Sequence, residues 1–376
     1  MLKIKLSKYI LTAVAFLALS SGMAWGQKTW DGGAGNGLWN SPANWNLDTL
    51  PALGDNVTIG SGYSVTLNTD TPSLNSLTID PGATLALGTH TVSVTAAFTN
   101  NGTTSLDGST AGQVTAGTIS NGGSSAVIYT GTTTTLFMGN SYHDLTIDTG
   151  AALTIGAANI SVSGSLANNG TYSGTGTVTM TGTGTLSGFT GGSALNNLTI
   201  DPSATISLGT ANVSITSTLT VGGQLNLNGT GSVSSVGTLA NNGIIEISGI
   251  GTIPVSDNDS GTFRYSANVT TSIPALNGYS TLEITGGARA QTNAITADTL
   301  TINAPASLAL GTSTVTVNTM LNNNNLVIVD DTGTISRSDS DSGTFRYSAN
   351  VTTSIPTLNG YSTLEITGGA RAQTNA

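Results

Sequence analysis

Four segments of this chain align with one another without a gap, and this repetition restricts the fold more than any other feature. The segments begin at Leu77, Leu145, Leu198 and Leu300 and read LTIDPGATLALGTHTVSV, LTIDTGAALTIGAANISV, LTIDPSATISLGTANVSI and LTINAPASLALGTSTVTV. In each segment, pairs of apolar residues recur eight and ten residues after the leucine, and again after 15 and 17 residues. An internal period of this kind is typical of solenoids and propellers.

Alternation within each segment predicts three short strands separated by turns. Apolar side chains alternate with Thr, Ser and Ala, which places the two kinds on opposite faces of a strand. A unit of about 21 residues leaves turns of a few residues and no chain for a crossover helix. We therefore expect an all-β fold: a right-handed parallel β-helix (β-solenoid) with three short strands per coil of about 21 residues, capped at its N-terminal end.

A second, longer repeat lies at the C-terminal end. Residues 261–294 return as residues 343–376 with one change, from Ala275 to Thr357. The first copy runs on into a fresh repeat at Leu300, whereas the second copy stops at Ala376. Because the ends of a solenoid need polar caps and the second copy offers none, we expect the array to continue beyond this sequence.

The first residues have the pattern of an export signal. Three lysines within the first eight residues precede an apolar run from Ile10 to Leu19. Ala24-Trp25-Gly26 then places small residues where a signal peptidase reads them. The apolar run is too short for a membrane-spanning helix, which needs about 20 residues. We therefore expect residues 1–26 to be a signal peptide and the rest of the chain to be secreted.

Three tryptophans, Trp30, Trp39 and Trp45, are gathered in the stretch WDGGAGNGLWNSPANWN. Aromatic side chains at the mouth of a solenoid can cover its first open coil. Indole rings can also act as a platform on which sugars stack, so carbohydrate binding by these three residues is the alternative. The cap is favoured because every solenoid needs one. We expect residues 27–60 to form this Trp-rich cap with the first coil, and residues 61–376 to form the β-helix repeats.

Two patterns resemble known bacterial surface proteins. The opening WDGG…W…NW…P…GD-x-V-x-I resembles the start of many secreted bacterial β-helix proteins. The register NNGT…GTGTVTMTG…ALNNLTIDPSATISL resembles repeats of filamentous-haemagglutinin-like and autotransporter-passenger-like, adhesin-like proteins. This resemblance covers nearly the whole chain after the leader. It implies an adhesin or structural stalk that is attached to the bacterial cell surface, and it supplies no catalytic residues.

Composition leaves little material for catalysis. The chain has no Cys, two His and 7% charged residues, against about 25% in an ordinary domain. Candidate acids and bases recur in equivalent positions, and a repeated residue is expected to be structural because an active site occurs once. These sets are Asp80, Asp148 and Asp201, and the duplicated Arg264/Arg346, Glu283/Glu365 and Arg289/Arg371, for which we expect a salt bridge within a coil. We predict that the protein is not an enzyme.

Two acidic turns are the candidates for a metal site. Asp257 and Asp259, and later Asp339 and Asp341, place alternate carboxylates before a glycine, as some calcium loops do. Both turns lack the distal glutamate of an EF-hand, and neither matches the nonapeptide repeat of calcium-binding solenoids. A solvated turn is favoured and no cofactor is expected, with Ca²⁺ at these aspartates as the alternative.

Charge narrows the classes of partner. The net charge is −10, and loss of the three leader lysines makes it −13. Without a Lys or Arg between Lys28 and Arg264, the chain lacks the means to hold nucleic acid or anionic lipid. No apolar run after the leader reaches transmembrane length.

The function predicted from these observations is that of a non-enzymatic secreted or cell-surface repeat protein, either an adhesin or an extended structural stalk. Its partner would be a host or environmental surface, such as a glycan or matrix. The alternative is a carbohydrate-binding or polysaccharide-degrading β-helix protein whose catalytic part is absent or unrecognised.

Overall fold

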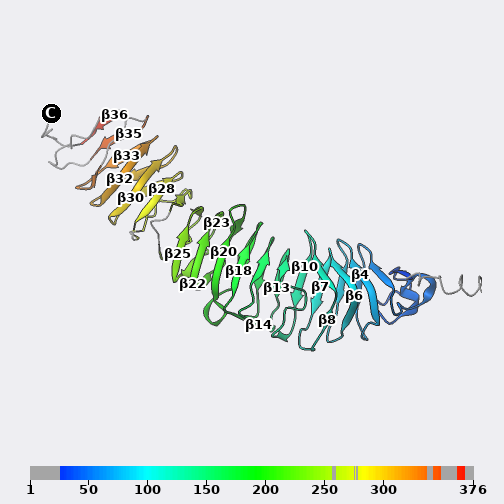
Figure 1. Ribbon diagram of the computed structural model, residues 1–376. Coiled ribbons are helices and arrows are strands. Elements are labelled where there is room, and N and C mark those ends of the chain that lie inside the picture. Colours follow the sequence, from blue (N-terminus) through cyan, green and yellow to red (C-terminus); the bar gives the residue numbers. More distant parts are fainter. Residues whose placement is uncertain are drawn as a thin grey trace, which may run out of the picture. The chain divides into compact units, whose positions relative to one another are not determined.

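The computed structural model describes residues 26–255, 260–274, 276, 278–336, 342–348 and 362–368. Strands make up 50% of the structure and helices 3%, and the strands stack in parallel as a β-solenoid of about 14 turns, which can be followed in Figure 1. The predicted fold class is confirmed. Apart from Gly26, the expected signal peptide lies outside the described residues.

The chain divides into two compact units. The first comprises Met1–Leu106 with Thr110–Gly122, and the second comprises Asp107–Ser109 with Gly123–Ala376. The elements of the first unit are β1 (Gln27–Thr29), η1 (Pro42–Asn44), η2 (Asn46–Asp48), β2 (Asn56–Ile59), β3 (Ser64–Thr66), β4 (Ser73–Ile79), β5 (Thr84–Ala86), β6 (Val92–Asn100), β7 (Thr103–Leu106), β8 (Val114–Thr115) and β9 (Thr118–Asn121).

Coils of the first unit follow the expected three-strand plan. Two rows of parallel strands are formed, β1-β2-β4-β6 with β8 and β9 beside β6, and β3-β5-β7. Leu77 pairs with Phe98 and Leu85 with Thr104, so partners in neighbouring coils are 21 and 19 residues apart. Strand β6 contains the third strand of one coil and the first strand of the next, and its pairing with β4 shifts between these two parts.

Elements of the second unit are more numerous. They are β10 (Ala126–Tyr129), β11 (Thr132–Thr133), β12 (Ser141–Tyr142), β13 (Asp144–Ile147), β14 (Ala152–Gly156), β15 (Ile160–Val162), β16 (Leu166–Asn168), β17 (Thr171–Gly174), β18 (Thr177–Met180), β19 (Thr183–Ser187), η3 (Gly191–Ser193), β20 (Leu195–Ile200), β21 (Thr205–Ser207), β22 (Val213–Val221), β23 (Gln224–Leu227), β24 (Val233–Ser235), β25 (Thr238–Asn241), β26 (Ile244–Ile247), β27 (Thr262–Tyr265), β28 (Tyr279–Ile284), β29 (Ala288–Ala290), β30 (Ile295–Ile302), β31 (Ser307–Ala309), β32 (Thr314–Asn323), β33 (Leu326–Val329), β34 (Thr334–Ile335), β35 (Thr344–Tyr347) and β36 (Thr363–Ile366).

Rows of strands in the second unit do not all keep to one face of the solenoid. Within this unit the rows are β10-β13-β16-β19-β21-β23-β26-β27-β28-β30-β32-β34, β11-β14-β17, β12-β15-β18-β20-β22-β24 with β25 beside β22, and β29-β31-β33-β35-β36. Val178 pairs with Ile160, in the third strand of its repeat, and also with Leu198, in the first strand of the next repeat. A row that begins with third strands of one repeat therefore continues with first strands of the next repeat. The order of strands along the row changes there, although the strands remain parallel.

Apolar positions of the repeat form the core. In the first repeat Leu77, Leu85 and Val92 are fully buried, and the matching residues of the other three repeats are at most 2% exposed. The side chains between them are half-buried or exposed. The alternation read from the sequence is thus the alternation between the inside and the outside of each coil.

Two kinds of glycine hold the turns. The glycine eleven residues after each starting leucine has a φ of +54° to +58°, a region that other residues rarely adopt; these are Gly88, Gly156, Gly209 and Gly311. The glycine of the first Asn-Asn-Gly turn, Gly102, is needed for a different reason: there is no room for a side chain at this position. A β-carbon on Gly102 would lie 2.4 Å from the carbonyl oxygen of Ala83 in the preceding coil.

Candidate functional site

The three tryptophans near the start of the chain form an interior cluster in the first unit. The Trp45 ring lies edge-on to those of Trp30 and Trp39, at centroid distances of 4.9 and 4.7 Å. Its Nε1–H donates to the Trp39 carbonyl at 2.8 Å. Each of the three residues is at most 2% exposed. These buried rings leave no free face on which a sugar could stack.

Backbone contacts show what this cluster does. The N–H of Trp30 donates to the Thr58 carbonyl at 3.0 Å, and the N–H of Trp39 donates to the Thr66 carbonyl at 2.9 Å. Thr58 belongs to β2 and Thr66 to β3, so the Trp-rich segment satisfies the open edge of two strand rows. Together with the buried indoles, this is how a cap protects the first coil of a solenoid.

The segment made of η2 and the loop that follows it, called the Leu47 loop below, exposes apolar side chains. Leu47 is 85% exposed and has a φ of +64°, and the next residue, Asp48, has a φ of +48°. Leu53, further along the same loop, is 79% exposed. A non-glycine residue in the left-handed region costs of order 1–3 kcal/mol, and such strain tends to cluster at functional positions. This loop is therefore a candidate contact surface.

The four aspartates considered for calcium lie outside the described residues: Asp257, Asp259, Asp339 and Asp341. Among the residues that are described, no group of three or more His, Asp or Glu side chains could hold a metal ion. The same part of the chain has no helix long and apolar enough to cross a membrane.

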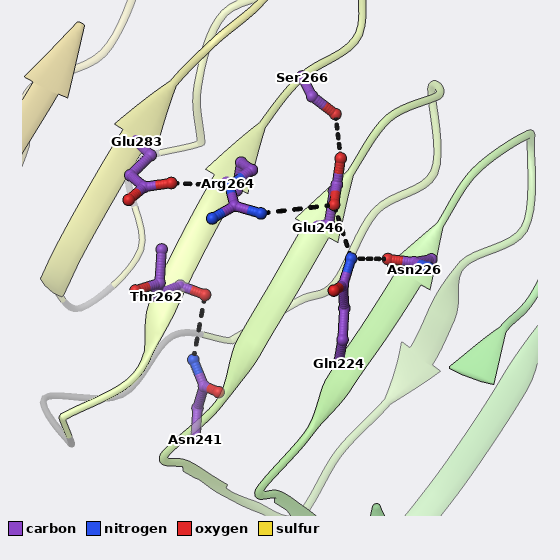
Figure 2. A network of polar contacts seen from close by, with 8 residues as sticks. All are labelled: Gln224, Asn226, Asn241, Glu246, Thr262, Arg264, Ser266 and Glu283. Carbon is purple, nitrogen blue, oxygen red and sulfur yellow. Dashed lines mark hydrogen bonds and ion pairs between the residues drawn. The ribbon is translucent and has the colours of Figure 1, made fainter. Parts of the chain in front are cut away.

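Figure 2 shows a network of polar side chains on the outer face of β23, β26, β27 and β28. Glu246 is at its centre. Its Oε2 accepts from Gln224 Nε2 at 2.7 Å and lies 3.8 Å from Arg264 Nη1, while its Oε1 accepts from Ser266 Oγ at 2.6 Å. Arg264 Nε donates to Glu283 Oε2 at 2.7 Å.

Gln224 Nε2 also donates to Asn226 Oδ1 at 2.7 Å. Figure 2 shows a separate bond as well, from Nδ2 of the buried Asn241 to the Thr262 carbonyl at 3.5 Å. Gln224, Glu246, Arg264 and Glu283 belong to four successive coils. The network thus joins coils along the stack, and its carboxylates are engaged with a cation and with hydroxyl and amide donors.

The salt bridge expected within a coil is wrong in its placement. Arg264 faces Glu283, and Arg346 faces Glu365 at 2.6 Å, because each pair is matched in register between neighbouring coils. Outward side chains within a coil point in different directions, whereas those in register on adjacent parallel strands are stacked about 4.8 Å apart. The stacked geometry therefore selects the pair between coils.

Arg289, expected in such a pair, lies in the interior instead. It is the central residue of β29, is 1% exposed, and takes the inward position in register with Leu308. Its guanidinium lies over the Tyr265 ring, 5.4 Å from the centroid. Burial lowers the pKa of Arg289 and raises the pKa of Tyr265 to about 12. Residue type gave no signal of this inward position, which follows from the register of Arg289 with Leu308 in the next coil.

Comparison with known proteins gives one match. The G8 domain family matches residues 44–183, which is less than half of the chain and includes most of the first unit. No curated protein and no solved structure shows significant similarity to the chain. Arg289 and the network around Glu246 lie outside the residues matched by the G8 family.

Proposed function

We propose that the chain is a non-enzymatic, extracellular repeat protein that acts as a structural stalk. The observation that carries this proposal is how the outer polar side chains are used. They bond to the coil before or after their own: Asn75 Nδ2 donates to Asn56 Oδ1 at 2.7 Å, and Asn318 Nδ2 donates to Asp298 Oδ1 at 2.8 Å. Side chains used in this way strengthen the stack along its axis and are not free to act on a substrate.

The energetics of a solenoid favour the same role. Each repeat has contacts only with its neighbours, so stability is a sum of coil and interface terms that continues for as long as coils are added. Inside the solenoid, buried aliphatic side chains of neighbouring coils pack against one another. Outside it, hydrogen bonds between polar side chains join neighbouring coils. The predicted export signal and the acidic chain with few charged residues support an extracellular location.

A deletion that removes whole coils tests the stalk. Removal of residues 261–342 joins Ser260 to Gly343 and keeps one copy of the duplicated segment. We expect this variant to fold with a similar unfolding midpoint. Its maximum dimension in X-ray scattering should fall by about 20 Å, because about four coils are lost and each coil adds about 4.8 Å.

A control deletion of residues 271–342 removes an incomplete number of coils and should destabilise the fold. A length that does not change on in-phase deletion, or an in-phase variant that does not fold, would contradict the stalk. Release of new reducing ends from any of a panel of polysaccharides incubated with the purified chain would contradict its non-enzymatic character and favour the polysaccharide-degrading alternative.

The Leu47 loop favours a second candidate, an adhesin. Glycine at this position removes the strain of the left-handed φ, so Leu47→Gly should stabilise the fold by about 1 kcal/mol. If the loop adheres to a matrix, glycan or cell surface, the same variant should bind immobilised samples of that surface less well than the unsubstituted chain. Equal binding by both proteins would show that this loop is not adhesive.

A further inference from the structure

One coil of the second unit carries polar side chains at inward positions where the two coils that follow carry aliphatic residues. Arg289 pairs in register with Leu308, and Leu308 pairs with Val327. Arg289 is 1% exposed, and Gln291, the next inward residue, is 3% exposed. Polar groups in an apolar column cost free energy unless they find partners. The partners of these two side chains therefore reveal what each one does.

Gln291 has a complete set of structural contacts. Its Oε1 accepts from the Ile273 N–H at 3.1 Å, and its Nε2 donates to the carbonyls of Ile273 and Asn293 at 2.8 and 3.1 Å. The Gln291 amide thus makes the two hydrogen bonds to the Ile273 backbone that a neighbouring strand would make in a regular coil. Nothing further is needed to explain why Gln291 is buried.

Arg289 is not satisfied in the same way. Its Nη1 donates to Thr271 Oγ1 at 2.8 Å and to the Thr271 carbonyl at 3.4 Å, and its Nη2 donates to the Ala267 carbonyl at 3.0 Å. Its buried Nε has no partner. Among the described residues no carboxylate forms an ion pair with it. A buried cation with spare donors and no counter-ion is costly.

Arg289 lines a pocket of about 120 Å³ in the second unit. One wall is apolar and includes Ile247, Ile250 and Ile253, while Thr271 and other residues of the irregular segment form another wall. Ile250 is 61% exposed. Since water occupies about 30 Å³ per molecule in the liquid, the pocket has the volume of about four waters.

We propose that this pocket binds a small organic anion, a short-chain carboxylate of about the size of propionate or butyrate. The carboxylate pairs with the guanidinium of Arg289, and the alkyl chain lies against Ile247 and Ile253. Arg289 is 1% exposed and its Nε is fully buried, so the carboxylate reaches the guanidinium after a local shift of this side chain, which can then present two parallel N–H groups to it. A few polar groups in a mostly apolar pocket are the usual composition of a small-molecule site.

The second copy of the duplicated segment provides a matched comparison. Arg371 is the counterpart of Arg289, but the positions that correspond to Gly249 and Ile250 of the pocket wall are Asp331 and Thr332. Ile247 and Ile253 have the apolar counterparts Val329 and Ile335, so the sequences differ in the isoleucine at position 250 and in the carboxylate at Asp331. The proposal therefore concerns one site, at Arg289.

The test uses isothermal titration of the full chain with acetate, propionate, butyrate and inorganic sulfate. Propionate or butyrate should bind best, with a stoichiometry of one. Arg289→Met should weaken that binding at least tenfold and leave the chain folded, because its neighbour in register is Leu308. Ile250→Asp should weaken it comparably, since it places a carboxylate at an exposed position of the pocket wall. Arg371→Met is the matched control and should bind like the unsubstituted chain.

Several outcomes would overturn the proposal. They are the absence of binding for all four anions, equal affinity for sulfate and butyrate, or full binding by Arg289→Met. Equal losses in Arg289→Met and Arg371→Met would likewise show that the effect is not that of this pocket. If Arg289→Met does not fold, Ile250→Asp decides: undiminished binding by that variant overturns the site.

Discussion

Residues 261–294 and 343–376 have nearly the same sequence but follow different coils. In the coil before the first copy, Glu246 of β26 is in register with Arg264. In the coil before the second copy, Ile328 of β33 is in register with Arg346. Arg264 therefore faces two carboxylates: its Nε lies 2.7 Å from Glu283 Oε2, and its Nη1 lies 3.8 Å from Glu246 Oε2. Among the described residues, the carboxylate that Arg346 faces is that of Glu365, with Oε2 2.6 Å from Arg346 Nε.

This difference separates what a repeat contributes from what its neighbour contributes. The short Arg–Glu bond forms in both copies, so it follows from the repeated sequence itself. The surroundings do not follow from it: the side chain of Arg264 is 29% exposed and that of Arg346 is 39% exposed. In a solenoid the preceding coil decides the environment of a residue as much as its own coil does.

The largest expected effect is a loss of stability on truncation of a core phenylalanine, and it should be the same in both copies. Phe263 and Phe345 are at most 1% exposed, and each follows an aliphatic residue in register, Ile245 and Val327. Truncation of either to Ala should lower the free energy of unfolding by about 3–5 kcal/mol through lost burial and a cavity. Guanidinium denaturation followed by circular dichroism measures both losses. A difference above about 2 kcal/mol would show that core packing also depends on the copy.

An alkaline titration should give the next largest effect. Burial raises the pKa of Tyr265 to about 12, from an unfolded value of 10.0. The unfolded chain therefore loses this proton first, and stability that is complete below pH 10 is lost as the pH rises towards 12. Two pKa units correspond to about 3 kcal/mol, so Tyr265→Phe should remove a loss of about that size from the urea denaturation curves.

The matched variant Tyr347→Phe compares the second copy. If both variants reduce the loss of stability between pH 10 and 12 by the same amount, the two tyrosines have equivalent surroundings. An undiminished loss of stability in Tyr265→Phe between pH 10 and 12 would contradict the assignment of that loss to Tyr265. The pKa of Tyr279 is raised by burial and also by Tyr265, whose hydroxyl lies 3.5 Å away, so Tyr265→Phe should remove part of the Tyr279 contribution as well.

Most of the fold could be predicted because it follows from alternation. Leu77, Leu85 and Val92 mark three strands that occur where expected, and their counterparts in the other repeats are buried as well. The periodic pattern is sufficient because each coil needs only its own inward residues and those of its neighbours. The change in strand order at Val178 could not be predicted, since it depends on how one coil is placed on the next and leaves the alternation intact.

The candidate site was predicted less well, for a related reason. Residue type suggested ion pairs for both Arg264 and Arg289, but only Arg264 points outward. The inward position of Arg289 is decided by its register with Leu308, and register across coils is a tertiary property. The tryptophans show the same limit, because an indole can form a cap or a sugar platform, and burial alone separates the two.

The smallest effect tests the difference between the copies directly. Glu246→Ile gives the first copy the residue found at the equivalent position of the second, and Ile328→Glu does the reverse. Glu246→Ile should lower the free energy of unfolding by about 1 kcal/mol, because Arg264, Ser266 and Gln224 each lose a partner. Ile328→Glu should raise it by at most about 0.5 kcal/mol, since the more exposed Arg346 gains less from a second carboxylate.

The isosteric variant Glu246→Gln, measured at low and high ionic strength, separates the electrostatic contribution of Glu246 to stability from its hydrogen-bonding contribution. Glu246→Gln keeps an acceptor for Ser266 and removes the charge beside Arg264, so we expect about half of the loss measured for Glu246→Ile. High ionic strength should shrink the difference between Glu246→Gln and the unsubstituted chain, because screening weakens a partly exposed ion pair. If Glu246→Gln is as stable as the unsubstituted chain at low salt, the second carboxylate contributes no electrostatic stability, and the two copies differ only in packing and hydrogen bonding.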